Sequence, residues 1–267
     1  MNESRVLLEI EDGVATLTLN APEKLNALGT RMLAELNSAL DRIRVDSELR
    51  VAVLTGAGRG FCSGADLSEG AAVSGPREAR VEALRRKMEE EFNPAIKKIL
   101  DLDVPTVAAV NGIAAGGGYG VALACDLVIA AESAEFVLVF TPQLGVIPDL
   151  GASWHAPRAL GRAKAMAAAF FGDRMSATEA VDAGLIWKCV PDAELESEVD
   201  AVARRLRSGP TLAYPAVRRA FDAATTQTLH EQLDLEAREQ PALLGTDDFR
   251  EGVRAFSEKR APKFEGK

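Results

Sequence analysis

The stretch NGIAAGGGYGVALACD, residues 111–126, decides the fold of this 267-residue chain. Three consecutive glycines begin at Gly116, and Gly120 follows, directly in front of VALAC, which reads as a buried helix. Glycine weakens the interior of a helix. At the start of a helix, however, the first N–H groups have no intrahelical acceptor and are free to point at an oxygen. We therefore expect Gly116 and Gly117 to open a helix against a substrate oxygen.

A second loop of small residues has the same character. FCSGADL, residues 61–67, follows the apolar strand LRVAVLTG and places Gly64 and Ala65 before a possible short helix. Two such loops, each offering one backbone N–H, would suit a carbonyl oxygen that acquires negative charge during a reaction. For Gly118 and Gly120, close packing of a helix on a strand explains the glycines equally well.

Nucleotide binding is the main alternative use of these glycines. GAGRGF and GGGYG both follow strands, but Phe61 and Val121 stand where a dinucleotide fingerprint needs its third glycine. Neither stretch contains the lysine of a phosphate-binding loop. The sequence therefore argues against a nucleotide site.

Strands and helices alternate along the rest of the chain. GVATLTLN alternates apolar and polar residues, whereas LRVAVLTG, PTVAAVNG and CDLVIAA are continuous apolar runs typical of buried strands. The segment 26–46 has helical spacing. After about Gly151 the strand signals fade, and MSATEAVDAG carries a capping box at Ser176 and Glu179. The pattern predicts an α/β core and a helical C-terminal third. The stretch 69–92 begins with small residues and Gly, continues as a charged helix, and is the best candidate for a mobile loop.

Composition restricts the function classes. The net charge of −9 leaves no basic surface for nucleic acid. Cys62, Cys125 and Cys189 are too widely spaced for a zinc site or a disulfide framework. No apolar run is long enough to span a membrane, and the N-terminus lacks the features of a signal peptide. We expect a cytoplasmic protein without a metal.

The two loops resemble the paired motifs of the crotonase superfamily, also called the enoyl-CoA hydratase/isomerase family. The resemblance rests on GRGFCSGADL at 58–67 and VPTVAAVNGIAAGGGYGVALACDLVIA at 104–130, and it extends from ATLTLNAPEKLNAL to FREGVRAFSEKRAPKF. It implies a spiral of ββα repeats with a helical C-terminal part, an acyl-CoA thioester as substrate, and trimers that commonly pair into hexamers. We expect residues 1–200 to form the core with the acyl-CoA site and residues 201–267 to form a helical oligomerisation region.

The resemblance also assigns site residues. It implies that the N–H groups of Ala65 and Gly117 form an oxyanion hole. The CoA part of the substrate would be bound by two groups of residues, one around the first loop and one near the C-terminus: Lys24, Leu25, Ala65, Asp66 and Leu67, and then Phe256 and Lys259, which reach CoA in a neighbouring subunit. Without the family match, Lys24 and Lys259 would be read as solvated surface lysines, and Asp66 is also read as a structural residue that accepts backbone N–H bonds. No cofactor is expected, since CoA belongs to the substrate.

Members of the family differ in which carboxylates their active sites contain, and these carboxylates determine the reaction. A hydratase of this family has one Glu at the position of Gly120 and a second near Thr141, and this chain has neither. Asp149 in GVIPDLGAS lies among apolar neighbours, where burial would raise its pKa and suit it to move a proton. VIPDLGASW and GLIWKCV are most similar to the ring-epoxide and 3-enoyl-CoA isomerases of phenylacetate-type degradation.

The sequence therefore favours an acyl-CoA isomerase, with Asp149 shuttling a proton and Ala65 and Gly117 holding the enolate. The reaction would shift a double bond or rearrange a ring epoxide. Two alternatives stay open. One is a 2-enoyl-CoA hydratase of fatty-acid β-oxidation that activates water with Asp149 alone. The other is an acyl-CoA-binding or RNA-binding protein that keeps the fold without catalysis.

Overall fold

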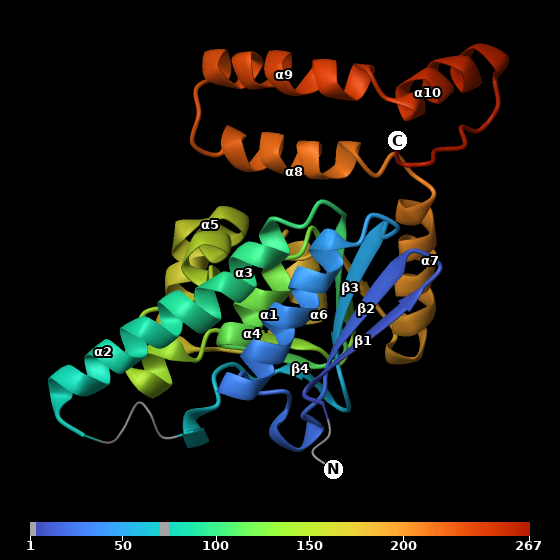
Figure 1. The fold of residues 1–267 in the computed structure, drawn as a ribbon. Coiled ribbons are helices and arrows are strands. Elements are labelled where there is room, and N and C mark those ends of the chain that lie inside the picture. The colour runs from blue at the N-terminus through green and yellow to red at the C-terminus, as the bar shows by residue number, and fades with distance from the viewer. Residues whose placement is uncertain (1–3, 70–74) are drawn as a thin grey trace.

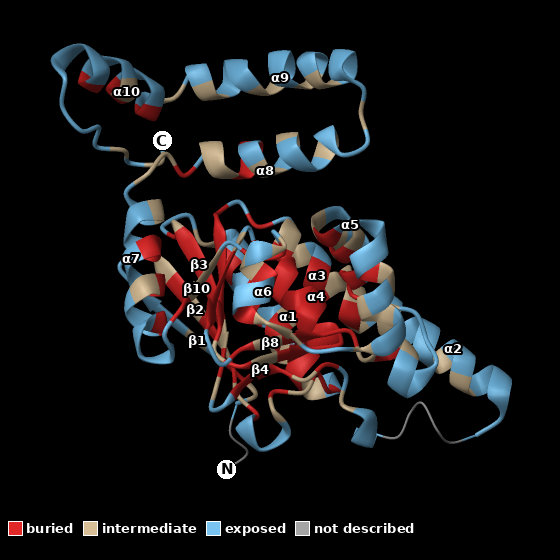
Figure 2. Ribbon diagram, turned by 180° about the vertical axis from the view of Figure 1, so that it is seen from behind, coloured by how far each residue is buried: buried red, intermediate tan, exposed pale blue. Residues whose placement is uncertain are grey.

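The structure is a computed structural model that describes residues 4–69 and 75–267 (Figure 1). Two β-sheets and the helices around them form a core. Figures 1 and 2 show α8, α9 and α10 as a separate helical layer beyond that core. The α/β class and the helical C-terminal part expected from the sequence are confirmed.

The larger sheet has six strands in the order β1-β2-β3-β5-β7-β10. β1 and β2 form an antiparallel hairpin, and every other neighbouring pair is parallel. The hairpin turns at Asp12 and Gly13, whose φ angles are 51° and 76°. The strands are β1 (Val6–Glu11), β2 (Val14–Leu19), β3 (Val51–Gly56), β5 (Thr106–Val110), β7 (Leu127–Ala131) and β10 (Lys188–Val190).

The smaller sheet has four strands in the order β4-β6-β8-β9. They are β4 (Gly60–Cys62), β6 (Ile113–Ala115), β8 (Glu135–Val137) and β9 (Met175–Ser176). The strand pairs β3/β4, β5/β6 and β7/β8 each place one strand in the larger sheet and the next in the smaller one. This alternation is the ββα repeat that the family resemblance implied.

The larger sheet is buried on both faces, which explains its continuous apolar runs. In β3, Ala52 and Leu54 face the main core between the sheets and helices. Val51 and Val53 face a second apolar cluster, which α7 closes with Val199 and Val202 among others. Figure 2 shows the buried residues concentrated in these layers, whereas the helices α8, α9 and α10 are mostly exposed.

Helices surround the two sheets, and most of them follow the sequence pattern. α6 begins with the predicted capping box, in which Ser176 and Glu179 bond to each other's backbone N–H groups. The helices of the core are η1 (Pro22–Lys24), α1 (Thr30–Val45), η2 (Leu67–Glu69), α2 (Arg77–Lys87), η3 (Met88–Phe92), α3 (Asn93–Leu100), α4 (Gly117–Leu123), η4 (Phe140–Leu144), α5 (Ala152–Phe171), α6 (Ala177–Asp182) and η5 (Asp192–Glu194).

The C-terminal part begins with α7 (Leu195–Arg207), which packs on the larger sheet and spans the expected boundary at residue 200. The layer beyond the core is made of α8 (Ala213–Ala224), α9 (Leu229–Leu244) and α10 (Asp247–Glu258). We call residues 213–258 the arm. Within it, Thr228 and Glu231 form a second capping box at the start of α9.

One sequence expectation needs correction. Strands do not end near Gly151, since β9 and β10 add edge strands to both sheets. With two and three residues, they are too short to show a period in the sequence. The charged helix expected within residues 69–92 is present, since α2 and η3 cover residues 77–92, whereas residues 70–74 lie outside the described chain.

Candidate active site

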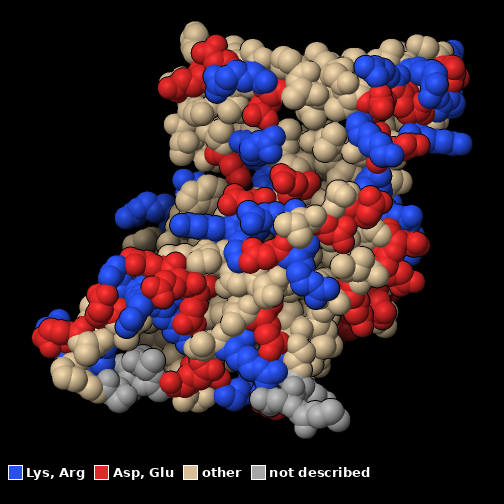
Figure 3. All heavy atoms as spheres, viewed as in Figure 1, with Lys and Arg blue, Asp and Glu red and all other residues tan. Residues whose placement is uncertain are grey.

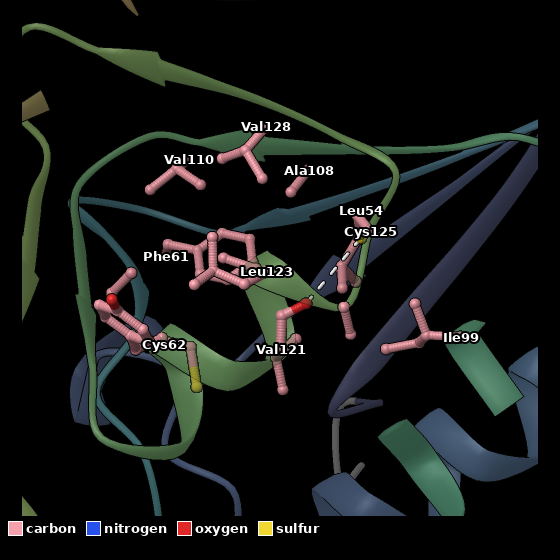
Figure 4. Packing of buried hydrophobic residues seen from close by; sticks show 14 of the residues in the cluster. Leu54, Phe61, Cys62, Ile99, Ala108, Val110, Val121, Leu123, Cys125 and Val128 are labelled. Atoms are coloured by element: carbon pink, nitrogen blue, oxygen red, sulfur yellow. Dashed lines mark hydrogen bonds between the residues drawn. The ribbon is translucent and has the colours of Figure 1, made fainter. Parts of the chain in front are cut away.

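The first predicted N–H donor lies at the start of α4. The helix begins at Gly117, and its N-cap Gly116 has φ 53° and ψ −122°, a conformation that glycine adopts without strain. The N–H of Gly117 is therefore one of the helix-terminal donors that have no intrahelical acceptor. Figure 4 shows α4 held among buried side chains, with Cys125 Sγ donating to the carbonyl of Val121 at 3.9 Å.

The second predicted donor belongs to the loop after β4. Leu28 pairs with this loop, because its N–H donates to Gly64 O at 2.7 Å and its carbonyl accepts from Asp66 N at 3.2 Å. Peptide groups alternate in direction along an extended segment. The N–H of Ala65 therefore points away from Leu28.

The two loops lie against each other. A β-carbon on Gly64 would stand 3.0 Å from Gly117 N, and one on Gly118 would stand 2.1 Å from Cys62 O. Glycine at both positions permits this backbone contact. The structure thus brings Ala65 and Gly117 into neighbouring loops, as the sequence predicted.

Asn26 organises this region, and its importance was missed from the sequence. It is fully buried and has φ 56°. Its Nδ2 donates to the carbonyl oxygens of Ala57, Gly60 and Phe61, at 3.0, 2.8 and 3.2 Å, and its Oδ1 accepts from Ala21 N at 2.8 Å. One amide therefore connects residues 21–28 to the strand that leads into loop 61–67, the predicted oxyanion loop. A polar residue inside the otherwise apolar LNAL was the available signal.

The predicted CoA residues of the first group share one surface. Lys24 Nζ donates to Asp66 Oδ2 at 2.6 Å and to Ser68 Oγ at 3.0 Å. The bond from Lys24, followed by that from Ser68, lowers the pKa of Asp66 to about 2. Leu25, with φ 50°, accepts a bond from Ser63 N at 2.9 Å, and Leu67 is 56% exposed. Lys24 and Asp66 therefore form a fixed pair beside the oxyanion loop.

Asp149 lies in the turn before α5. Its carbonyl accepts from Ala152 N at 2.9 Å, and the next residues, Leu150 and Gly151, have φ angles of 50° and 83°. Burial raises the pKa of the Asp149 carboxyl from 3.8 to about 6. No ion pair to this carboxylate occurs within residues 4–69 and 75–267. Among the described residues, it is a half-buried acid without a cation to hold its charge.

The turn places Asp149 next to the start of α4. A β-carbon on Gly117 would lie 2.6 Å from Leu150 Cδ1, and one on Gly120 would lie 2.2 Å from Leu150 O. Leu150 is buried at this contact. The structure therefore brings together the three predicted catalytic positions: Ala65, Gly117 and Asp149.

The two positions where a hydratase of this family has glutamates are occupied differently. Gly120 is buried against the backbone of Leu150. Thr141, in η4, donates its hydroxyl to the carbonyl of Val146 at 2.9 Å. Neither position offers a carboxylate in this structure.

Phe256 and Lys259 lie at the end of the arm. Phe256 is 87% exposed on α10, and Lys259 ends the helix with φ 53°. Figures 1 and 2 both show α10 separated from the core that contains α4. A single chain therefore does not bring these residues to the oxyanion loops, and their contact with CoA stays a prediction.

Other titratable groups have structural surroundings. Burial raises the pKa of the Cys62 thiol to about 12, so the thiol stays protonated beside the oxyanion loop. Burial, followed by the charge of Arg158, lowers the pKa of His155 to about 4. The described residues contain no cluster of three or more His, Cys, Asp or Glu side chains that could hold a metal ion.

Two further observations concern the charge of the surface and the hydropathy of the helices. On the face drawn in Figure 3, acidic and basic side chains are interspersed over the core and the arm. Within the described ranges, every helix is too short or too polar to cross a bilayer.

Comparison with known proteins agrees with this arrangement. The sequence pattern of the family described as enoyl-CoA hydratase/isomerase matches residues 9–267. The chain is 46% identical, over 100% of both chains, to a Rhodobacter capsulatus protein named "Probable enoyl-CoA hydratase". It is 43% identical, over 98% of both chains, to 1,2-epoxyphenylacetyl-CoA isomerase of Escherichia coli.

A solved structure leads to the same family. Enoyl-CoA hydratase from Bacillus anthracis superposes with a TM-score of 0.89 at 33% identity, covering 98% of this chain and 100% of that one. The match extends through the two sheets and the C-terminal helices alike. The chain belongs to the enoyl-CoA hydratase/isomerase family and has the crotonase fold.

Proposed function

We propose that this protein is an acyl-CoA isomerase that shifts a carbon–carbon double bond, or rearranges a ring epoxide, through a thioester enolate. The observation that carries the proposal is Asp149, a half-buried carboxyl whose pKa is raised to about 6 and whose neighbour Leu150 contacts Gly117 and Gly120. A general base works best when its pKa lies near the working pH. Such a carboxylate can take up a proton and return it.

The proposed reaction needs one base. The thioester carbonyl oxygen of a 3-enoyl-CoA accepts hydrogen bonds from the N–H groups of Ala65 and Gly117. The Asp149 carboxylate removes a proton from C2. The electron pair of that C–H bond forms the enolate, whose negative oxygen the two N–H groups stabilise. The double bond then forms between C2 and C3 while protonated Asp149 returns its proton to C4. Atoms and charge balance without a cofactor or a metal.

CoA binding is proposed for the surface around Lys24, Leu25, Asp66 and Leu67, completed by Phe256 and Lys259 of a neighbouring chain. Lys24 supports this proposal because its ammonium group lies on the exposed side of the oxyanion loop, where a phosphate could compete with Asp66. A trimer or hexamer is proposed on the exposed apolar side chains of the arm, which include Phe221, Leu229 and Phe256. The cytoplasm is the proposed compartment, since all three cysteines are free thiols.

Hydration of a 2-enoyl-CoA is the second candidate, favoured by the name of the Rhodobacter capsulatus relative. Asp149 alone would then activate the water. The positions of Gly120 and Thr141 count against this candidate, because neither supplies the carboxylates that jointly hold water in the hydratases that this chain resembles. The E. coli relative, named 1,2-epoxyphenylacetyl-CoA isomerase at 43% identity, favours isomerisation of an acyl-CoA over hydration and agrees with the ring-epoxide form of the first candidate.

The test is the initial rate of conversion of a 3-enoyl-CoA to its 2-enoyl isomer, followed by the absorbance of the conjugated thioester. Asp149→Asn is expected to lower kcat by about 10²-fold or more, the usual scale for a lost acid/base group. Hydration of crotonyl-CoA is measured in parallel with both proteins. Rapid hydration without isomerisation would replace the first candidate with the second, and loss of neither rate in Asp149→Asn would remove Asp149 from the chemistry.

A further inference from the structure

A close backbone approach in the candidate site involves Gly120, a residue without a side chain. Gly120 lies within α4, where glycine costs about 0.5–1 kcal/mol relative to alanine. A β-carbon there would stand 2.2 Å from Leu150 O, 2.9 Å from Leu150 C and 3.0 Å from Leu150 Cβ. The obstacle is backbone, so a side-chain rotation cannot relieve it. Any residue other than glycine would push the turn away from α4.

This turn is also conformationally unusual. Leu150 is a buried non-glycine residue with φ 50°, and Gly151 continues with φ 83°. A leucine in the left-handed region costs about 1–2 kcal/mol and persists only where surrounding contacts hold it. Those contacts are with α4, since Leu150 Cδ1 covers Gly117 and the Leu150 carbonyl covers Gly120. The position of Asp149, one residue earlier, depends on the same contacts.

We propose that Gly120 is a positioning residue for Asp149, because its lack of a side chain lets the turn 149–151 close onto α4 beside the oxyanion donors. The inference deepens the proposed isomerase function and rests on it. It also has a consequence for specificity. A β-carbon at position 120 and the Leu150 backbone need the same space, so a glutamate there would require the turn that carries Asp149 to shift.

The surroundings of Asp149 allow a specific readout. His155, on α5, packs on Gly151, with Nε2 3.5 Å from the place of a β-carbon on that glycine. Arg158 lies over the Trp154 ring at 4.1 Å from its centroid. Because burial keeps His155 neutral above about pH 4, it adds no titration near pH 6. The acidic limb of the rate profile is then expected to report Asp149.

The experiment measures kcat, KM and the pH dependence of isomerisation for wild type, Gly120→Ala and Gly118→Ala, with folding checked by circular dichroism. A displaced Asp149 is expected to lower kcat by about 10–100-fold in Gly120→Ala, since errors of about 1 Å cost this much. Its acidic limb is expected to move from about pH 6 toward 3.8, because a displaced carboxyl is less desolvated. KM should change by less than about threefold, since the predicted CoA contacts lie elsewhere.

Gly118→Ala is the matched control. Its β-carbon would meet Cys62 O at 2.1 Å, on the oxyanion loop and away from Leu150. It is expected to lower kcat while the acidic limb stays near pH 6. Wild-type kcat and an unmoved limb in Gly120→Ala would overturn the inference, and so would equal shifts of the limb in both variants.

A second variant covers the case in which Gly120→Ala does not fold. Leu150→Ala removes the side chain that covers Gly117 without adding a clash, and the same downward shift of the acidic limb is expected. An unmoved limb in folded Leu150→Ala would also overturn the inference. Failure of the proposed function has a different signature: wild type would show no isomerisation, or Asp149→Asn would retain it.

Discussion

Arg218 on α8 holds Asp126, the residue directly before β7, in a two-point ion pair. Nε donates to Asp126 Oδ1 at 2.5 Å, and Nη2 donates to Oδ2 at 2.6 Å. The remaining donors bond to the carbonyl oxygens of Leu100, Leu102 and Val104, at 2.7, 2.7 and 2.9 Å. An arginine has five N–H donors, and all five are used here. One side chain therefore joins the arm to the core.

Replacing Arg218 by lysine should weaken this junction. Lysine has three donors and no planar fork, so at least two of the five bonds are lost. We expect the free energy of unfolding to fall by about 1.5–3 kcal/mol, the scale of bonds to a charged group. Urea unfolding of the wild type and the variant measures this change in free energy. Arg219→Lys, next along α8 and paired with Glu239 at an exposed site, is the control and should change stability by less than about 1 kcal/mol.

Asn26→Asp should disrupt the oxyanion region while keeping the side-chain shape. The substitution turns an amide that donates to three carbonyl oxygens into a carboxylate that faces them. A buried charge that faces three carbonyl oxygens and keeps only the Ala21 N–H as a donor is costly, and we expect a loss of about 3 kcal/mol or more in thermal or urea unfolding. Asn20→Asp, at an exposed amide that bonds to Ser4 O, is the control. Equal losses in the two variants would contradict the organising role of Asn26.

Asp149→Asn should stabilise the folded protein at neutral and higher pH. Burial raises the pKa of Asp149 from 3.8 to about 6, so the folded state binds this proton more tightly than the unfolded chain does. The stability that wild type gains from this tighter proton binding is fully present below about pH 4, and it is lost as the pH rises through about 6, the pKa of Asp149 in the folded protein. We expect the variant to exceed wild type by about 1–2 kcal/mol at pH 8, and by much less at pH 4.

The control for that measurement is Asp182→Asn, at an exposed position of α6. Its effect should stay within about 0.5 kcal/mol at both pH values, as is usual for surface substitutions. If Asp149→Asn were less stable than wild type at pH 8, the carboxylate would have a stabilising partner that the proposed mechanism does not include.

Lys24→Ala should separate binding from chemistry. If Lys24 contacts CoA, its loss raises KM by about tenfold, the value of one charge-assisted bond, and leaves kcat within about twofold. Steady-state kinetics of isomerisation measures both constants. Lys97→Ala, at an exposed lysine of α3, is the control with unchanged kinetics. An unchanged KM in Lys24→Ala would make Lys24 only the structural partner of Asp66.

Sequence patterns predicted much of the fold and of the site. The continuous apolar runs of β3, β5 and β7 follow from burial on both faces of the sheet, and the start of α4 follows from glycines that precede an apolar run. The two small-residue loops and Asp149 were singled out in the sequence because each lies within a short motif. Asn26 was missed because its partners, Ala57, Gly60 and Phe61, lie more than thirty residues away in the chain.

The sequence by itself determined the local elements: the strand runs, the helix starts and caps, and the absence of a carboxylate at positions 120 and 141. Local propensity, periodicity and motif spacing are properties of neighbouring residues, so they can be read directly. Only the tertiary structure decided the contact of Gly120 with Leu150, the Arg218 junction and how far burial raises the pKa of Asp149. These depend on distances between distant segments and on burial, which arise when packing brings those segments together.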